Sequence, residues 1–300
     1  MFNENIQIVI TCSSICKETF KNHTDDIIAL LKSYSIKIDN IQKLGPCASD
    51  FYFKTNKKKI SDIKIKLQSE KYNFSDICIQ KNINRKKKII ACDMDMTVID
   101  VETIDLIATK ILNDPTMQDI TEKTMMGKIK FKKSIVLRTK KLKGINLNKI
   151  QSLLPKIKYT PGVKIVIRTM NKFGNHSMLV SGGYDVIAKK VANEIGFHEV
   201  VSNRLEIKNK ILTGELENNI IDKKGKLYFV KKKVLGLNLK KNDVLAVGDG
   251  DNDIDMIEYA GLGIAWRAYP EVKKHAVASI QNSFISILYF QGYKEEDFVR

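Results

Sequence analysis

The sequence contains few of the residues that mark fibrous, disulfide-stapled or membrane-spanning proteins. Its 300 residues include 16 glycines and 5 prolines, too few for a collagen-like or low-complexity chain. The five cysteines form an odd set without a repeated short spacing, so we expect free thiols in a reducing compartment rather than a disulfide framework. No run of 18 apolar residues occurs, and the apolar run at 6–10 is too short for a signal peptide. These absences predict a cytoplasmic protein without a transmembrane helix.

Acidic residues and arginine are also scarce. Lys+Arg count 51 and Asp+Glu count 34, which gives a formal net charge of +17, yet only six of the 51 cations are arginine. Because proteins that read nucleic acid rely on arginine, and aromatic residues do not alternate with the basic runs here, we expect no nucleic-acid and no membrane partner. The charge still favours anionic, phosphorylated substrates. A protein that merely binds a polyanion is the alternative from another class, and it predicts salt-sensitive binding.

Length and composition predict a soluble protein of two domains. About 150 residues per domain suggests two, and 43% hydrophobic with 28% charged residues is typical of globular chains. The first 85 residues carry patterns in the order β-α-β-β-α-β, which is that of ferredoxin-like folds. The predicted strands lie at 6–10, 36–38, 51–53 and 74–79, and the predicted helices at 25–31 and 60–67. We therefore predict an α+β ferredoxin-like domain over 1–85.

The remaining residues, 86–300, predict a doubly wound α/β domain. Short continuous apolar runs suit buried parallel strands, and helical patterns separate them. A helical insertion at about 102–158 follows the first of these strands. Ligands bind at the carboxyl ends of the strands in such sheets, so the residues after each strand are candidates for the site. The predicted strands are 89–92, 178–180, 244–247 and 262–265.

Polar groups follow three of these strands. Asp93 and Asp95 come after the first strand and can face one pocket. The string Ser181-Gly182-Gly183 comes after the second, where a hydroxyl and free N–H groups at a helix N-terminus suit phosphate oxygens. The loop 248–253, Gly-Asp-Gly-Asp-Asn-Asp, comes after the third and crowds carboxylates that need protons or a cation such as Mg²⁺. Each string alone is also explained by a solvated turn or a helix cap, but their combination indicates phosphoryl chemistry.

The combination resembles the haloacid dehalogenase (HAD) superfamily, and within it the phosphoserine phosphatases. The resemblance covers roughly 86–290 and is carried by the strings at 92–99, 180–184, 248–253 and 260–265. It implies a HAD-like fold with a small helical cap. It also implies hydrolysis of O-phosphoserine to serine and phosphate, the final step of serine biosynthesis. The alternative is a related phosphatase or phosphotransferase that acts on another small phosphomonoester, such as phosphohomoserine or phosphothreonine.

The resemblance assigns catalytic and metal-binding roles to four aspartates. It implies that Asp93 is the nucleophile, which forms an aspartyl-phosphate. It implies that Asp95 protonates the leaving group and then activates water. Mg²⁺ is expected to be held by Asp93, by the backbone carbonyl of Asp95 and by Asp249. Asp253 is expected to lie near the metal, either bound to it or one step away.

The resemblance also assigns the phosphate-binding groups. Ser181 and the backbone of Gly182 are expected to bind the phosphoryl oxygens. The family needs a lysine before the second acidic loop, and Lys226 has the family spacing. It would neutralise charge on the phosphoryl group and on the nucleophile. Lys223 and Lys224 are close competitors for this role in a lysine-rich chain.

Substrate recognition rests on the helical insertion. The segment 101–105 matches the family segment whose glutamate, here Glu102, binds the substrate ammonium. The segments 127–131 and 134–138 match those that close over the substrate, so Arg138 is expected to pair with the substrate carboxylate and Phe131 to exclude water. Asn252 is expected to contact the substrate as well. Solvated helix faces and ordinary cap packing are the simpler explanations of these residues.

The N-terminal domain resembles the family only at the level of fold. Its element order is ACT-like, and the sequence leaves open whether it is an amino-acid-binding regulatory module or a dimerisation element. A homodimer, if one forms, is expected to form through this domain.

Overall fold

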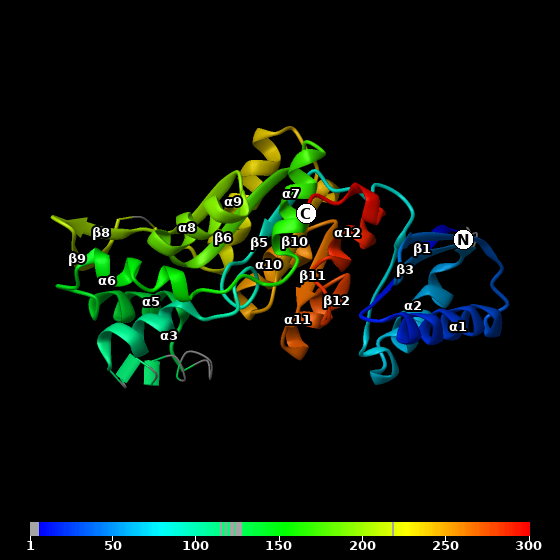
Figure 1. Ribbon diagram of the computed structural model, residues 1–300, viewed down its shortest axis with the longest axis horizontal. Coiled ribbons are helices and arrows are strands. Elements are labelled where there is room, and N and C mark those ends of the chain that lie inside the picture. The colour runs from blue at the N-terminus through cyan, green and yellow to red at the C-terminus, as the bar shows by residue number, and fades with distance from the viewer. Residues whose placement is uncertain (1–5, 115, 118, 121–122, 124–127, 218) are drawn as a thin grey trace.

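A single ten-stranded sheet extends through the computed structural model, which describes 6–300 apart from 115, 118, 121–122, 124–127 and 218 (Figure 1). Neighbouring strands are antiparallel at its N-terminal end and parallel in the remainder. In spatial order the strands are β2 (Ile38–Gly45), β3 (Ala48–Thr55), β1 (Ile6–Ser14), β4 (Ser75–Lys81), β12 (Ala278–Ile280), β11 (Leu262–Trp266), β10 (Val244–Gly248), β5 (Ile89–Cys92), β6 (His176–Tyr184) and β7 (Glu199–Asn203). A separate antiparallel hairpin consists of β8 (Leu205–Lys208) and β9 (Ile211–Leu216).

Helices flank the sheet and build the insertion. The α-helices are α1 (Lys17–Ser33), α2 (Lys57–Leu67), α3 (Thr103–Ile107), α5 (Phe131–Lys140), α6 (Leu147–Gln151), α7 (Val163–Lys172), α8 (Asp185–Ile195), α9 (Lys223–Gly236), α10 (Ile254–Tyr259), α11 (Pro270–His275) and α12 (Ser286–Phe290). Short turns of 3₁₀-helix are η1 (Glu70–Tyr72), η3 (Leu154–Lys156), η4 (Lys241–Asp243), η5 (Asp251–Asp253) and η6 (Glu295–Asp297), and η2 (Ala108–Leu112) is a π-helical turn.

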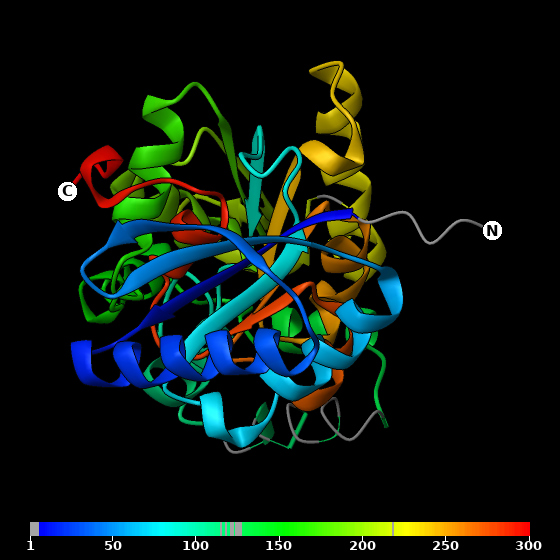
Figure 2. The ribbon, with the colours of Figure 1, turned by 90° about the vertical axis from the view of Figure 1, so that its right-hand side faces the viewer.

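The N-terminal elements occur in the predicted order, β1-α1-β2-β3-α2-β4. Helices α1 and α2 cover one face of the four strands, where Ile10 and Phe53 pack in one core with Ile27 and Ile63. Figure 2 shows this layer, with α1 running below the strands. The spatial order β2-β3-β1-β4 with antiparallel neighbours is that of a ferredoxin-like sheet.

One predicted boundary in this region is wrong. The strand expected at 36–38 begins only at Ile38 and continues to Gly45. Ile36 belongs instead to the end of α1, because its N–H donates to the Leu31 carbonyl across a left-handed Ser35 (φ 54°). The short stretch 36–38 therefore contains both the end of the helix cap, at Ile36, and the start of the strand, at Ile38.

Alternate side chains of the parallel strands enter two different cores. On one face, Ile90 and Cys92 of β5 pack with α7, α8 and α12. On the other face, Ile89 and Ala91 of the same strand pack with α9 and α10. Because helices cover both faces, these strands appear in the sequence as continuous apolar runs. The predicted doubly wound α/β architecture is confirmed.

The segment between β6 and β10 contains more than the predicted helices. It also holds β7 and the β8-β9 hairpin, whose two-residue turn Asn209-Lys210 has left-handed φ values of 51° and 63°. Such a turn usually has the sequence Asn-Gly. Because lysine stands in the place of glycine here, the sequence did not predict this hairpin. The hairpin is joined to the cap, since the Leu212 N–H donates to the Ile145 carbonyl at 2.9 Å. Figure 1 shows the hairpin beside α5 and α6, at the end of the molecule opposite β1–β4.

Buried polar contacts hold the N-terminal elements to the rest of the chain. Strands β4 and β12 share a single residue pair. Beside it, the Asp76 carboxylate of β4 accepts hydrogen bonds from the segment 281–286 at 2.8–3.1 Å. Arg85 donates to Asp50 at 2.7 Å and to the Phe290 carbonyl at 3.2 Å. One continuous sheet thus joins the regions predicted as 1–85 and 86–300, and the division between them stays a prediction.

The cysteines are free thiols. Cys12, Cys78 and Cys92 are buried, Cys47 is half-buried and Cys16 is exposed. In the part of the chain that the structure describes, no helix has both the length and the apolar character that crossing a membrane requires.

Candidate active site

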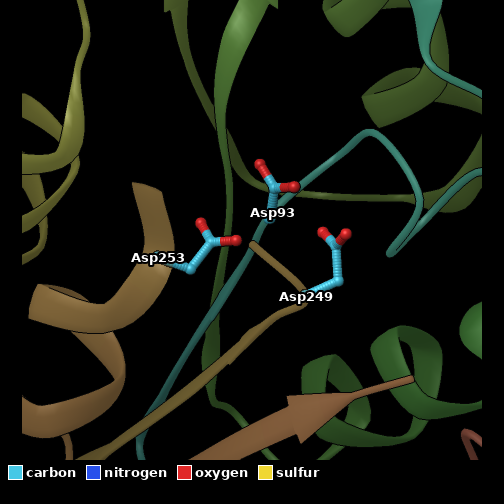
Figure 3. Close-up of side chains that lie close together, drawn as sticks. All are labelled: Asp93, Asp249 and Asp253. Atoms are coloured by element: carbon cyan, nitrogen blue, oxygen red, sulfur yellow. The ribbon is translucent and has the colours of Figure 1, made fainter. Parts of the chain in front are cut away.

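Acidic side chains from two neighbouring strands converge at the carboxyl end of the parallel sheet. Asp93 follows β5, Asp249 follows β10, and Asp253 ends the turn η5. One carboxylate oxygen of each lies within 4.8 Å of the others. Figure 3 shows the three side chains gathered at this point, with their carboxyl groups close together. The direct pairing of β5 with β10 therefore unites two acidic strings that are far apart in the sequence.

Lys226 is the cation within this cluster. Its side chain is fully buried, and its ammonium group donates hydrogen bonds to Asp93 and to Asp253, the latter at 2.7 Å. Burial alone would lower the pKa of Lys226, but Asp253 and Asp93 together raise it above its usual value. Lys226 therefore stays charged, and it lies where a phosphoryl group attacked by Asp93 would need neutralisation.

The competing lysines lie elsewhere. Lys223 pairs with Asp251 and Asp255 at 3.5 Å, on the more exposed side of the loop. Lys224 is exposed. Helix α9 begins at its Asp222 cap, which fixes the direction in which each of the following side chains points. Of the three lysines, only Lys226 then points inward, against the nucleophile candidate.

The donor set fits a hard divalent cation. Three carboxylates face a single lysine charge, so negative charge is in excess. Burial, and then the charge of Asp253, raises the pKa of Asp249 to about 7 in the metal-free protein. Gly248 permits this crowding, since a Cβ there would lie 2.4 Å from Cγ of Asp253. Carboxylate oxygens are the ligands that Mg²⁺ prefers, and a cation at Asp93, Asp249 and Asp253 would relieve their repulsion.

Asp95 lies at the side of the cluster toward the cap. Its Oδ1 accepts a hydrogen bond from the backbone N–H of Thr103, the first residue of α3, at 3.1 Å. Burial, and then the charge of Asp93, raises the pKa of Asp95 to about 7. A carboxyl group with this pKa can both give and accept a proton near neutral pH.

The Ser181-Gly182-Gly183 string differs in setting from the prediction. We expected it at a helix N-terminus, but β6 continues through Tyr184 and α8 begins only at Asp185. The pairing of β6 with β7 is irregular between Val180 and Tyr184, so the string bulges out of the ladder instead of capping a helix. The Ser181 hydroxyl accepts a hydrogen bond from the Gly183 N–H at 2.9 Å.

Asn203 is a residue of the site that sequence reasoning missed. It is fully buried at the end of β7. Its Nδ2 donates to the Gly182 carbonyl and its Oδ1 accepts from the Ile221 N–H, both at 2.8 Å. One amide thus ties the Ser181-Gly182-Gly183 string to the segment that leads into α9 and Lys226. A lone asparagine after a short strand carries no sequence signal of such a role.

The helical insertion that forms the cap lies directly against the Ser181-Gly182-Gly183 string. A Cβ on Gly182 would come within 2.8 Å of Cζ of Phe131, the first residue of α5. Glycine is therefore required for the aromatic ring to approach the backbone this closely. The contact places the Phe131 ring against the string, and the exclusion of water by this ring stays a prediction.

Arg138 and Glu102 bring opposite charges to the cap side of the site. Arg138 is buried, and its Nε has no hydrogen-bond partner among the described residues. Burial lowers the pKa of Arg138, while Tyr184, Asp105 and Glu102 oppose that effect. The Glu102 side chain reaches solvent, but the surrounding protein removes part of the water from around its carboxyl group. This desolvation, and then the negative charge of Asp95, raises the pKa of Glu102 to about 7. An orphaned buried guanidinium nitrogen is costly unless a ligand supplies an acceptor.

Two further sequence predictions concern the edges of the site. Asn252 is half-buried in η5, adjacent to Asp253. Gly127, in the segment expected to close over the substrate, lies outside the described residues.

Comparison with known proteins decides the family. The model of the haloacid dehalogenase-like hydrolases matches 90–258, more than half of the chain. The chain belongs to the haloacid dehalogenase-like hydrolases. The strings around Asp93, Ser181 and Asp249 all lie within the part that matches the family model, and the parallel sheet is consistent with this family.

Curated phosphoserine phosphatases are similar to this haloacid dehalogenase-like hydrolase. The protein of Archaeoglobus fulgidus is 36% identical over 207 residues, which are 68% of this chain and 60% of that protein. The protein of Methanocaldococcus jannaschii is 35% identical over 201 residues, which are 66% of this chain and 94% of that protein. A solved structure of a substrate-bound phosphoserine phosphatase complex is 32% identical with a TM-score of 0.63, and the match covers 68% of this chain and 98% of that one.

The lengths of some relatives differ from that of this hydrolase. The chain spans 60%, 52% and 50% of the phosphoserine phosphatases of Archaeoglobus fulgidus, Streptomyces coelicolor and Mycobacterium tuberculosis. The part of this chain that matches the family model, 90–258, contains the acidic cluster.

Proposed function

We propose that this protein is a Mg²⁺-dependent phosphoserine phosphatase, which hydrolyses O-phosphoserine to serine and phosphate in the cytoplasm as the final step of serine biosynthesis. The observation that carries the proposal is the unpartnered Arg138 guanidinium nitrogen, with Glu102 nearby, on the cap side of the phosphoryl site. Phosphoserine has a phosphate, a carboxylate and an ammonium group. The site offers one complementary group to each, and the similarity to phosphoserine phosphatases supports the same substrate.

The first chemical step uses Asp93 and Asp95. The Asp93 carboxylate attacks phosphorus, and the bond from phosphorus to the serine oxygen breaks, leaving an aspartyl-phosphate. Protonated Asp95 gives its proton to the departing serine oxygen, which is why a pKa of about 7 is useful. Lys226, buried against Asp93, offsets the charge that gathers on the phosphoryl oxygens.

The second step reverses the role of Asp95. As a carboxylate it takes a proton from a water molecule, and the oxygen of that water attacks the phosphorus of the aspartyl-phosphate. The bond from phosphorus to Asp93 breaks, which releases inorganic phosphate and restores the nucleophile. The Thr103 N–H holds Asp95 in position through both steps, and Phe131 over Gly182 excludes other water.

The metal would be held by Asp93, Asp249 and the Asp95 carbonyl, with Asp253 bound to it or beside it. When bound, Mg²⁺ supplies positive charge that lets an anionic carboxylate approach an anionic phosphate.

The test is phosphate release from substrates that each lack one recognition group. Phosphoserine is compared with phosphoethanolamine, which lacks the carboxylate, and phosphoglycolate, which lacks the ammonium group, with and without Mg²⁺. Arg138→Ala should lower kcat/KM for phosphoserine by about 10- to 100-fold, since a charge-assisted pair is lost, and should leave phosphoethanolamine nearly unchanged. The matched control is Arg168→Ala, because Arg168 is an exposed arginine of α7.

Two results would count against parts of this proposal. A preference for phosphohomoserine or phosphothreonine would keep the Asp93 chemistry and replace the substrate. Phosphate release that is unchanged in Asp93→Asn, or absent with every ester, would remove the phosphatase assignment.

A further inference from the structure

A cavity lies at the junction of the N-terminal elements and the hydrolase unit, away from the acidic cluster. Its volume is about 320 Å³, within the range of small-molecule pockets, roughly 300–1,000 Å³. Helix α2 and strand β4 line one side, and α11 and β12 line the other. None of its lining residues belongs to the candidate active site.

The charged groups of this junction cavity are all cations. Lys64 of α2 and Lys273 of α11 face it from opposite sides of the junction, and both are half-buried. Neither has an acidic partner among the described residues. Lys274, also in the lining, is paired with Glu271 at 2.6 Å. No acidic residue is among those that line the cavity in the described part of the chain.

The neutral lining suits an organic molecule rather than a bare ion. Polar side chains that can donate hydrogen bonds, Gln68, Ser69 and Gln281, lie beside the two free lysines. Apolar walls are supplied by Leu67 and Val277. The volume leaves room for a carbon skeleton next to an anionic group.

We infer that this cavity binds a small organic phosphate monoester, with the phosphate between Lys64 and Lys273. Lysine ammonium groups bind phosphate as point charges, and a phosphate monoester, with close to two negative charges at neutral pH, can be shared by two of them. A free amino acid fits less well, because no lining carboxylate is present to take its ammonium group. The cavity is therefore an anion site at the junction, distinct from the amino-acid-binding role that the sequence left open for the N-terminal domain.

Such a ligand adds a link between two parts of the molecule whose strands β4 and β12 meet in a single β-pair, in addition to the buried contacts of Asp76 and Arg85. The pair Ser279–Ile77 is the only ladder contact between β4 and β12 in the described strands, and both residues line the cavity. A phosphate held by α2 on one side and α11 on the other adds a link between the two cores. Binding therefore stabilises the folded chain, by an amount that rises with ligand concentration.

The experiment uses the full chain carrying Asp93→Asn, in EDTA, so that the ligand is not consumed. The probe is sn-glycerol 3-phosphate, followed by titration calorimetry and by the thermal unfolding midpoint, with free serine as the comparison ligand. The test variant adds Lys64→Gln and Lys273→Gln. The matched control adds Lys58→Gln and Lys232→Gln, two exposed lysines that remove the same charge.

Glycerol phosphate should raise the unfolding midpoint of the background protein and of the control variant. In the Lys64→Gln/Lys273→Gln variant its binding at one site per chain should weaken by about tenfold or more, because two charge-assisted contacts are lost. Equal binding in all three proteins would place the ligand elsewhere, such as the active site, and overturn the inference. Serine binding that exceeds glycerol phosphate binding and is lost in the same variant would overturn its chemistry. Phosphatase assays on the chain with Asp93 intact are independent of either result.

Discussion

At the residue scale, the charge balance of the site depends on Lys226. It is fully buried between Asp93 and Asp253, where bulk water does not reach to neutralise the two carboxylates in its place. The catalytic role proposed for Lys226 rests on its position rather than on lysine content, since Lys223 lies three residues away and pairs with the outer face of the loop.

Replacing Lys226 by methionine should lower kcat for phosphoserine about 10²- to 10³-fold, the usual effect of removing a group that stabilises transition-state charge. Lys223→Met is the matched control and should stay within a few-fold of the unchanged protein, because its ion pairs are long and partly exposed. Steady-state kinetics at saturating Mg²⁺ measures both. Equal losses in the two variants would contradict the assignment of Lys226.

At the scale of elements, the site requires three segments to hold a fixed relation: the end of β6, the end of β7 and the start of α9. Asn203 makes the connection through two hydrogen bonds of 2.8 Å. Its replacement leaves the Gly182 carbonyl and the Ile221 N–H buried without partners, and each such group costs about 1–3 kcal/mol.

We expect Asn203→Leu to lower the free energy of unfolding by about 2 kcal/mol or more and kcat/KM by about tenfold or more. Asn203→Asp keeps the acceptor for Ile221 but loses the donor to Gly182, so it should recover part of the stability and little of the activity. Asn193→Leu, on the exposed side of α8, is the control. A loss of stability in Asn203→Leu with kcat/KM unchanged would show that Asn203 supports the fold alone.

At the scale of the whole molecule, the N-terminal elements and the hydrolase unit share a sheet and a set of buried polar contacts. Asp76 is almost fully buried and accepts hydrogen bonds from a segment more than 200 positions away in the chain. Hydrogen bonds to a charged group are worth about 1.5–3 kcal/mol each.

Asp76→Ala should therefore reduce the free energy of unfolding by at least about 3 kcal/mol, measured by denaturant titration. It should also separate the unfolding of the two parts, so that intrinsic probes in each no longer report one transition. Asp39→Ala, at an exposed position of β2, should have little effect. A single unchanged transition in Asp76→Ala would mean that the remaining contacts, the β4–β12 pair and those of Arg85, suffice.

The acidic cluster also predicts a pH dependence of the metal-free protein. In the folded state the pKa values of Asp95 and Asp249 are raised to about 7, against about 3.9 in an unfolded chain. Between these values the folded state binds more protons at these two groups than the unfolded state, so their contribution to stability is largest at low pH and is lost as pH rises through 7. The contribution from this pair is isolated by comparing the protein with Asp95→Asn/Asp249→Asn, in EDTA, at pH 5 and pH 8.

The unchanged protein should lose more stability than the double variant between these two pH values. Added Mg²⁺ should restore more stability at pH 8 than at pH 5, because the metal competes with protons for the carboxylates. A difference between the two proteins that is flat with pH would contradict the crowding of these groups.

The sequence by itself determined the α/β fold, the order of the N-terminal elements and the residues of the acidic cluster. It did so because apolar runs specify buried parallel strands, and because the polar strings follow those strands directly. Because β5 and β10 are neighbouring parallel strands, Asp93 and Asp249, which follow them, lie side by side.

Only the tertiary structure decided the rest. The continuation of β6 through Ser181, the link made by Asn203 and the cavity at the β4–β12 junction arise from contacts between segments distant in sequence. The Asn209-Lys210 turn is local, but it lacks the Asn-Gly pair that usually marks such a hairpin. Local residue patterns report backbone preference and burial, whereas a single buried hydrogen bond or a bulge depends on which partner the folded chain presents. That is why the pattern around Asp93 was legible from the sequence and the role of Asn203 was not.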